Sequence, residues 1–333
     1  MDIVVTWVDG SDPAWLEERA RQLRATGLER RNRWNDGEQR YRDWGLLKYW
    51  FRGVERFAPW VDRIHFVTWG HVPAWLDRAH PRLNIVNHRD FIPAKYLPTF
   101  SSHTIELNLH RIKGLSDEFV YFNDDVFLVK PVGKARLFSK GLPCGAALLG
   151  PIKTIQNGIR AEINDVYVIN AKFDKRRTLS RNWRKWYSAR YGLKVFRNIY
   201  MLPFGYFPGF YIGHGPRPYL KSTFQKVWDE NAEVLEETCS HRFRQTTDVN
   251  QWLMEYWQYA SGTFAPARPL KGRIFEDDAS YADFQADRIA GCEFVCVNDG
   301  ADIADFARVR SQAESVLASI LPEPCSFEKG AGR

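Results

Sequence analysis

The sequence predicts an α/β fold in which helices flank a mainly parallel, twisted sheet. The first observation is a set of short apolar runs, such as Ile3 to Val8, which are typical of buried strands. The second is that helical patterns alternate with these runs four times, which favours parallel strands joined by right-handed crossovers. The third is that two runs end in acidic loops, at Asp9 and at Asp124. Because such sheets bind ligands beyond the carboxyl ends of their strands, both loops are expected to face one site.

The composition allows a large core and favours anionic partners. With 333 residues and 44% hydrophobic content, the chain can form one big domain or two. The charge of +7 and the pI near 9.1 suit nucleotides, phosphorylated glycans, nucleic acid or an acidic membrane surface. The 13 Trp residues suit flat sugar or base rings, or they fill a core.

The cysteines and the N-terminus favour a reducing, cytoplasmic location. Five Cys with no paired CxxC predict neither a disulfide framework nor a zinc site. The start of the chain lacks the pattern of a secretion signal, and no apolar run approaches the ~18 residues of a membrane span.

The first elements follow from apolar spacing and from the residues at their ends. Asp12 is a good N-cap and Pro13 a good first helical residue, so a helix is expected from Ala14 to about Gly27. A polar loop is expected from Glu29 to Arg42. The elements expected next are a helix between Asp43 and Pro59, strands Ile64 to Trp69 and Leu83 to Val86, a short helix around Pro73 to Arg78, and a helix from about His103 to Lys113 closed by Gly114.

The second half is expected to be helical and rich in aromatic residues. Glycine and proline mark an irregular segment from Gly133 to Gly158. The ordered segments expected after it are Glu162 to Phe173, an amphipathic stretch from Tyr219 to about Glu237, a helix from Asp248 to Tyr259, a strand from Glu293 to Val297 that leads into Asn298, Asp299 and Gly300, and a closing helix to Leu321.

The acidic pair Asp124 and Asp125 lies between two apolar runs, Phe119 to Phe122 and Val126 to Val129. Adjacent acids beside a core strand repel each other and cost desolvation, so they are kept at a rim or beside a cation. Oxygen ligands from one or two carboxylates suit Mg²⁺. A solvated turn is the alternative, because Asn and Asp are common in turns for local reasons.

A basic and aromatic stretch runs from Lys175 to Arg197, with Trp183 at its centre. This mixture could follow a polyanion, or it could be an exposed helix face. No nucleic-acid signature accompanies it, so no nucleic acid is expected as a partner.

Four blocks of the sequence resemble the Stealth family. This family includes bacterial hexose-1-phosphate transferases of capsule synthesis and the α/β subunit of the animal lysosomal-enzyme GlcNAc-phosphotransferase. The blocks are DIVVTWVDGSDPAW from Asp2; RYRDWGLLKYWFRGVERFAPWVDRIHFVTWGHVPAWL with NIVNHRDFIP and LPTFSSHTIELNLHRIKGLSDEFVYFNDDVFL; NDVYVINAKF, HGPRPYLKSTF and RFRQTTDVN; and FVCVNDG with LPEPCSFEK. Two departures are Asp9, where many relatives have Asn, and the start of the chain almost at the first block.

The resemblance implies transfer of a sugar-1-phosphate, such as GlcNAc-1-phosphate, from a UDP-sugar to an acceptor hydroxyl, with release of UMP. It implies a Rossmann-like or GT-A-like core in residues 1–132, which binds nucleotide-sugar and metal, and an acceptor side in 133–333 of the same continuous catalytic domain. The cofactor expected is Mg²⁺ or Mn²⁺, the acceptor is a glycan or phosphoglycan, and contact with the inner membrane would run through other biosynthesis proteins.

The candidate site residues come from these blocks and have separate expected roles. Asp124 and Asp125 would hold the metal, His214 would be the base, Arg244 would contact phosphate, and Asp248 would orient the histidine or the metal. The residues expected on the nucleotide-sugar are Trp7, Val8, Asp9, Gly10, Asp12, His103, Arg111, Asn164 and Asn170.

Two other functions compete with this one. A metal-dependent glycosyltransferase would use the same acids but would release UDP. A non-catalytic module would bind polyanions through the stretch around Trp183.

Overall fold

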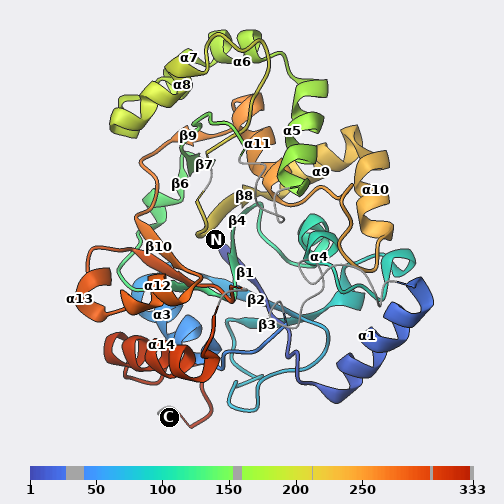
Figure 1. The fold of residues 1–333 in the computed structure, drawn as a ribbon, viewed down its shortest axis with the longest axis vertical. Coiled ribbons are helices and arrows are strands. Elements are labelled where there is room, and N and C mark those ends of the chain that lie inside the picture. The colour runs from blue at the N-terminus through green and yellow to red at the C-terminus, as the bar shows by residue number, and fades with distance from the viewer. Residues whose placement is uncertain (28–40, 153–159, 212, 301–302, 331–333) are drawn as a thin grey trace.

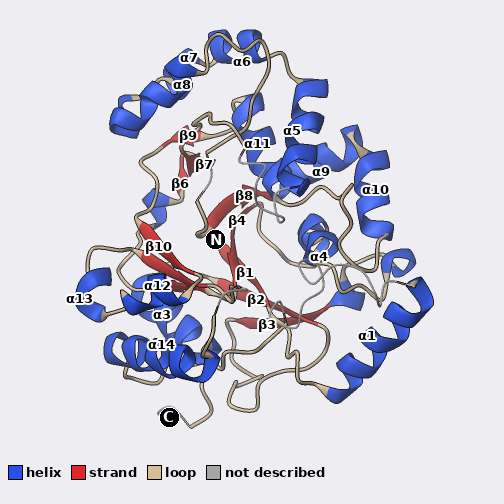
Figure 2. Ribbon diagram, viewed as in Figure 1, coloured by secondary structure: helices blue, strands red, loops and turns tan. Residues whose placement is uncertain are grey.

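A five-stranded sheet forms the centre of the molecule in the computed structural model, which describes residues 1–27, 41–152, 160–211, 213–300 and 303–330 (Figures 1 and 2). Its strand order is β3-β2-β1-β4-β8. The first four strands are parallel and β8 is antiparallel to β4, so the prediction of a mainly parallel sheet is confirmed. The strands are β1 (Asp2–Thr6), β2 (Arg63–Thr68), β3 (Leu83–Asn87), β4 (Glu118–Asn123) and β8 (Arg217–Leu220).

Alternate side chains of the central strands enter two different hydrophobic cores. In β4, Val120 and Phe122 join one core, whereas Phe119 and Tyr121 join the other. Helices cover both faces, which is why the sequence of these strands is apolar almost without interruption. Figure 2 shows α3 and α14 near one side of the sheet and α9, α10 and α11 near the other.

The helices around the sheet begin and end largely where the capping residues predict. In α1 (Pro13–Thr26), the Asp12 carboxylate accepts a hydrogen bond from the Trp15 amide, and Gly27 closes the helix in the left-handed conformation. The other longer helices are α3 (Leu47–Phe57), α4 (Ser102–Leu107), α5 (Arg160–Lys172), α6 (Lys175–Arg181), α8 (Phe196–Tyr200), α9 (Lys221–Glu230), α10 (Ala232–Ser240), α11 (Trp252–Ser261), α12 (Asp278–Ala282) and α14 (Phe306–Ile320).

Two three-stranded sheets lie beside the central one, and two short helices complete the list. One sheet has the order β10-β11-β5 and the other β6-β7-β9. Their bounds are β5 (Val126–Leu128), β6 (Phe138–Ser139), β7 (Leu142–Gly145), β9 (Ala265–Pro266), β10 (Gly272–Phe275) and β11 (Phe294–Val297), and the short helices are α7 (Trp183–Trp186) and α13 (Ala286–Ile289).

The prediction of a short helix around Pro73 to Arg78 is wrong. The segment is a turn in which the Leu76 amide donates to the Pro73 carbonyl. Leu76 is buried and forms a bridge with Glu328, and the Asp77 amide donates to the Phe327 carbonyl. The C-terminal segment therefore takes the backbone hydrogen bonds that a helix would use, and β2 connects to β3 without a helix.

Three other boundaries differ from the expected ones. The helix expected from His103 to Lys113 ends at Leu107, and a 3₁₀ turn (Leu109–Arg111) follows it, because the Asn108 side chain donates to the Thr104 carbonyl. The stretch expected to be amphipathic from Tyr219 starts inside β8, and the helix expected from Asp248 starts at Trp252. The polar loop expected from Glu29 lies mostly outside the described residues.

Candidate active site

Asp124 and Asp125 form the turn between β4 and β5. Asn123 at the end of β4 pairs with Thr6 at the end of β1, so the acidic turn and the loop of Asp9 leave the same edge of the sheet. The side chains of Asp124 and Asp125 are each half-buried. This is the edge at which parallel sheets bind ligands, so the sequence correctly predicted a shared edge for the two loops.

The two carboxylates of the turn have little to compensate their charge. Burial and the negative charge of Asp125 raise the pKa of Asp124 to about 8. Burial also raises the pKa of Asp125 to about 6, although the Cys296 thiol donates a hydrogen bond to its Oδ2 at 3.3 Å. The Asp125 Oδ1 is buried and has no hydrogen-bond partner. A cation would relieve this arrangement most directly.

Asp299 lies close to the same turn and was not among the predicted site residues. The Val297 amide, two residues before it, donates to the Asp125 carbonyl at 2.8 Å. Burial raises the pKa of Asp299, and Arg42 Nε lies 3.4 Å from its Oδ2. The sequence did contain a signal, because an apolar strand leads directly into Asn298, Asp299 and Gly300.

His214 lies on the chain just before β8. Tyr121 of β4 pairs with Arg217 of β8 in antiparallel register. Because His214 is three residues before Arg217 and Asp124 is three after Tyr121, this register brings both toward the same end of β4. Burial of the imidazole by neighbouring atoms and the positive charge of Arg217 lower the pKa of His214 to about 4, so the imidazole is neutral at pH 7. The residue as a whole nevertheless has an exposed surface.

Glu106 is a buried acid of α4 that was not among the predicted site residues. The Tyr121 hydroxyl donates to Glu106 Oε1 at 2.9 Å, and Thr6 Oγ1 lies 3.0 Å from that hydroxyl. Burial raises the pKa of Glu106 to about 7, while the charge of Arg244 opposes the shift. α4 ends one residue later, at Leu107, so Glu106 lies in its last turn.

Arg244 is linked to α4. Its guanidinium donates to the Ser102 hydroxyl, which also hydrogen-bonds Glu106. Arg244 therefore brings a positive charge to a buried acid at the sheet. Its expected contact with a phosphate stays a prediction.

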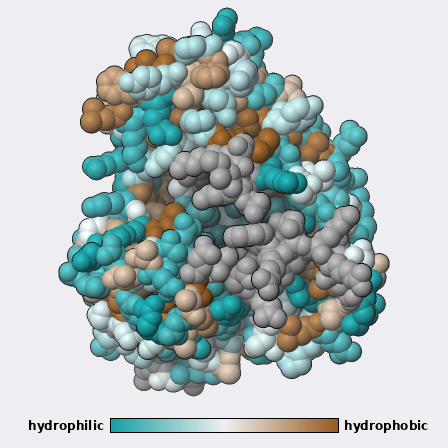
Figure 3. All heavy atoms as spheres, viewed as in Figure 1, coloured by the Kyte–Doolittle hydropathy of each residue, from teal (hydrophilic) through white to brown (hydrophobic). Residues whose placement is uncertain are grey.

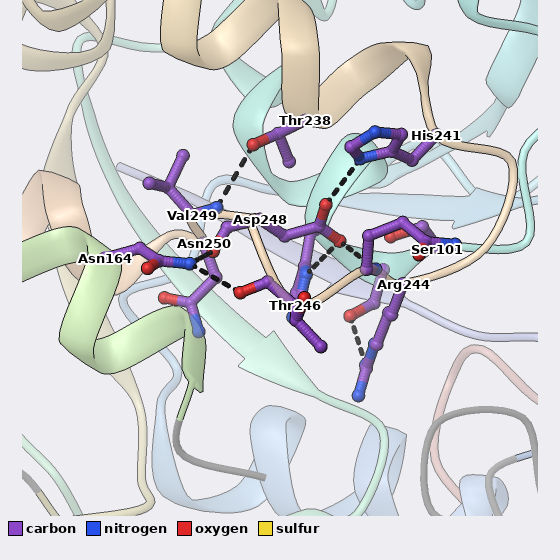
Figure 4. A network of polar contacts seen from close by, with 12 residues as sticks. Ser101, Asn164, Thr238, His241, Arg244, Thr246, Asp248, Val249 and Asn250 are labelled. Carbon is purple, nitrogen blue, oxygen red and sulfur yellow. Dashed lines mark hydrogen bonds and ion pairs between the residues drawn. The ribbon is translucent and has the colours of Figure 1, made fainter. Parts of the chain in front are cut away.

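Asp248 is fully buried and holds the loop that carries Arg244 (Figure 4). Its two oxygens lie 3.0 Å from His103 Nδ1 and 2.7 Å from His241 Nδ1, and the Gln245 amide donates to it at 2.9 Å. Despite burial, the hydrogen bonds from the two histidines lower the pKa of Asp248. Asp248 thus orients His103 and His241, whereas the sequence analysis expected it to orient the base or the metal.

Two asparagines of α5 tie neighbouring loops to the helix. Asn164 donates to the carbonyls of Thr246 and Asp248 at 2.9 and 2.8 Å. Asn170 both donates to and accepts from Phe207, at 2.9 and 2.8 Å. These bonds occupy much of each amide, so Asn164 supports the Arg244 loop and Asn170 lies apart from the acidic turn.

The predicted nucleotide loop after β1 has mostly packing and capping contacts in this structure. Trp7 is buried against Phe66, and Val8 packs against the small hydrophobic cluster that contains Trp15. Asp9 accepts hydrogen bonds from the Ser11 amide and hydroxyl, while Asp12 caps α1.

A glycine is required at Gly10 in the same loop. A Cβ there would lie 1.8 Å from the Tyr41 carbonyl oxygen.

Arg111 is not brought to the acidic turn. Its guanidinium stacks 4.8 Å from the centre of the Trp228 ring, and its Nε donates to Asn108 Oδ1 at 2.9 Å. These contacts account for the residue without a ligand.

The residues of the acidic turn fit a divalent cation of the Mg²⁺ type. They offer two adjacent carboxylates with raised pKa values and one buried oxygen without a partner. No group of three or more His, Cys, Asp or Glu side chains in the described parts of the chain is arranged to hold a metal alone. Mg²⁺ commonly takes one or two carboxylates and completes its shell with waters and substrate phosphates, so two are enough.

A mainly parallel sheet flanked by helices, with two acidic loops at its carboxyl edge, defines an α/β protein. Models of the Stealth family match conserved region 1 at residues 1–25, conserved region 2 at 40–143 and conserved region 3 at 213–261. The chain belongs to the Stealth protein family, as three of the quoted blocks predicted. The fourth, around Phe294, stays a prediction.

Relatives match over nearly their whole length. The capsular polysaccharide phosphotransferase WcwK of Streptococcus pneumoniae is 36% identical, covering 99% of this chain and 98% of that protein. The receptor polysaccharide phosphotransferase WefC of Streptococcus gordonii is 40% identical, covering 98% of each. The exopolysaccharide phosphotransferase cps2G of Lactiplantibacillus plantarum is 34% identical, covering 99% and 96%. These relatives and the family identify an enzyme of the phosphotransferase class.

Among solved structures, the galactosyltransferase LgtC in complex with donor and acceptor sugar analogues is similar, with a TM-score of 0.41 and 13% identity over 95% of this chain and 96% of that one. Across the described residues, no helix of this chain is long and apolar enough to cross a membrane.

Proposed function

We propose that the protein transfers a hexose-1-phosphate group from a UDP-sugar to a hydroxyl of an acceptor sugar and releases UMP, in the synthesis of a capsular polysaccharide or exopolysaccharide. The printed names of WcwK, WefC and cps2G support the polysaccharide and the phosphotransferase chemistry. The observation that carries the proposal is the pair of uncompensated carboxylates, Asp124 and Asp125, at the carboxyl edge of a parallel sheet. UDP-sugar donors would place the reaction in the cytoplasm.

In the proposed reaction, the acceptor oxygen attacks the phosphorus that carries the sugar. A new P–O bond forms, the P–O bond to the UMP phosphate breaks, and the acceptor proton passes to a base. When bound by Asp124 and Asp125, Mg²⁺ or Mn²⁺ would offset the charge of the phosphoryl oxygens and of the departing UMP. Arg244 would add a fork of donors for a phosphate.

Two residues are suited to accept the proton. His214 has a neutral imidazole at pH 7, because its pKa is lowered to about 4. Glu106 has a pKa raised to about 7, nearer to the value at which a general base works best. We assign the base to His214, which is open to solvent and hence to an acceptor, and we assign Glu106 the positioning of Arg244 through Ser102.

The test is the identity of the released nucleotide. The protein is incubated with Mg²⁺, an acceptor oligosaccharide and each member of a panel of UDP-sugars, and the products are resolved by chromatography and ³¹P NMR. UMP together with a phosphodiester resonance in the glycan is expected. UDP with a glycan free of phosphorus would establish the competing glycosyltransferase reaction instead.

A further inference from the structure

Exposed apolar side chains are concentrated in one part of the chain. Of the 12 large hydrophobic side chains that are exposed among the described residues, 11 lie between residues 163 and 211. The side chain of Leu193 is 84% exposed and that of Tyr200 is 75% exposed. Six exposed residues of α7, the 3₁₀ turn before α8, α8 itself and the loop after it form what we call the rim surface: Trp183, Leu193, Phe196, Ile199, Tyr200 and Tyr206.

The rim surface lies at one end of the molecule. Figure 1 shows α6, α7 and α8 side by side along an edge far from α1 and α14. Figure 3 shows brown and tan spheres among teal ones along the same edge. The helices are therefore placed where a flat surface could meet them.

These exposed side chains are not part of an unfinished core, because the same helices already bury another apolar set. Trp186 is fully buried and packs against Phe207, Phe210 and Phe264. The Asn198 side chain is also buried, and it donates to the carbonyls of Ala147 and Trp186 at 2.8 and 2.6 Å. The rim surface is thus a second apolar face of these helices. The buried residues around Trp186 hold the helices, and with them this face, against the rest of the molecule.

The charge of this region has one sign only. No Asp or Glu occurs from Lys175 to Trp228, although nine Lys and Arg residues occur from Lys175 to Tyr200. Three of these cations serve the protein itself: Lys175, Lys185 and Arg197 donate to backbone carbonyls. The others have exposed side chains with no carboxylate partner among the described residues: Arg176, Arg177, Arg181, Arg184, Arg190 and Lys194.

We propose that the rim surface docks the enzyme on an anionic lipid bilayer. Aromatic and aliphatic side chains that stand beside unpaired Lys and Arg match the boundary between acyl chains and negatively charged headgroups. A hydrophilic polyanion would use the cations but would leave Leu193, Phe196 and Ile199 in water. Docking goes beyond the proposed reaction, because it concerns where the enzyme works and not which bond it forms.

The first test is flotation of the intact protein with vesicles. Vesicles of phosphatidylcholine are compared with vesicles that also contain phosphatidylglycerol. Wild type is expected to bind the anionic vesicles at least tenfold more strongly, and added salt is expected to weaken this binding. Failure of the wild-type protein to bind anionic vesicles at low salt would overturn the proposal.

The second test separates the apolar from the basic contribution. An apolar variant (Leu193→Ser, Phe196→Ser, Ile199→Ser) and a charge variant (Arg181→Gln, Arg184→Gln, Arg190→Gln, Lys194→Gln) should each lose at least tenfold in vesicle binding. A matched control (Leu16→Ser, Arg89→Gln, Lys113→Gln) changes residues exposed elsewhere and should bind as wild type does. If only the charge variant lost binding, and heparin bound wild type equally well, the surface would be a polyanion site and the proposal would be wrong.

A fluorescent probe reports docking without loss of residues that hold the fold. Of the five free cysteines, only Cys144 is partly exposed, so Cys144→Ser gives a background for labelling. An environment-sensitive label at Leu193→Cys should shift its emission to the blue on anionic vesicles, and one at Leu16→Cys should not. The same emission from both labels would contradict the proposal. Nucleotide release measured with a water-soluble acceptor stays a separate readout, so failure of docking and failure of the transferase reaction can be told apart.

Discussion

Two acidic sites in this molecule, the buried Asp248 and the half-buried pair Asp124 and Asp125, differ in the hydrogen bonds that compensate their charge. Asp248 is surrounded by His103, His241 and the Gln245 amide, and its pKa is lowered. Asp124 and Asp125 have the Cys296 thiol and their own backbone amides as donors, and burial still raises their pKa values to about 8 and about 6. A carboxylate whose hydrogen bonds are complete is a structural anchor, whereas a neighbouring pair without them is prepared for a cation that the protein does not itself supply.

The largest effect is expected at the acidic turn. Asp125→Asn should lower kcat by about a thousandfold or more, since each ~1.4 kcal/mol lost from the transition state costs a factor of ten. The melting temperature should stay the same or rise, because the substitution removes one of two adjacent buried charges. Nucleotide release and calorimetry check both results, with Asp287→Asn, an exposed acid, as the control. An active Asp125→Asn enzyme would remove this residue from the metal site.

Arg244→Lys is expected to have the next largest effect. A lysine keeps the positive charge but lacks the planar fork of donors, so activity should fall about a hundredfold. Steady-state kinetics with varied UDP-sugar should place most of the loss in kcat. Arg242→Lys, in the same loop, is the matched control. Equal activity of Arg244→Lys and wild type would show that no bidentate phosphate contact is made.

Asp248→Asn should reduce stability more than it reduces the chemical step. Hydrogen bonds to a charged group contribute about 1.5–3 kcal/mol, so the free energy of unfolding should fall by about 2–3 kcal/mol. Activity should fall only as far as the loop of Arg244 loosens. Urea denaturation measures the first quantity, and kcat at a temperature well below unfolding measures the second. A stable but inactive Asp248→Asn would reverse the comparison and make Asp248 a catalytic residue.

The smallest effect is the pH dependence of that stability. The folded pKa of Asp248 is lowered, so its contribution is present above the unfolded value near ~3.9 and is lost as pH falls through the lower folded value. The folded pKa of His241 is raised, so its contribution is present below ~6.5 and is lost as pH rises through the raised value. The stability difference between wild type and Asp248→Asn should therefore be largest from about pH 4 to pH 6.5. A difference that is constant from pH 3 to pH 8 would contradict this account.

The sequence predicted those parts of the fold that depend on local pattern. Apolar runs and caps located β1, α1, β2, β3 and β4, because strand burial and N-cap chemistry act within a few residues. The prediction of a helix from Pro73 to Arg78 failed because the hydrogen-bond partner of this segment, Phe327, is some 250 residues away in the chain. No local pattern contains such a pairing.

The candidate site divides in the same way. Asp124, Asp125 and the edge that they share with Asp9 were predicted, because parallel register follows from alternating elements. Glu106 and Asp299 were missed, because their positions depend on where α4 ends and on how β11 pairs with β5. The partners of Asp248 were also missed, because His103 and His241 come from segments that are distant in sequence.

The central claim is that the acidic turn binds a divalent cation. The most direct measurement is Mn²⁺ binding by electron paramagnetic resonance, with UDP present to complete the ion's shell. We expect one bound ion in wild type and in Asp248→Asn, and a loss of at least tenfold in affinity when Asp124 or Asp125 is replaced by Asn. Equal Mn²⁺ binding by wild type and by both turn variants would contradict the account.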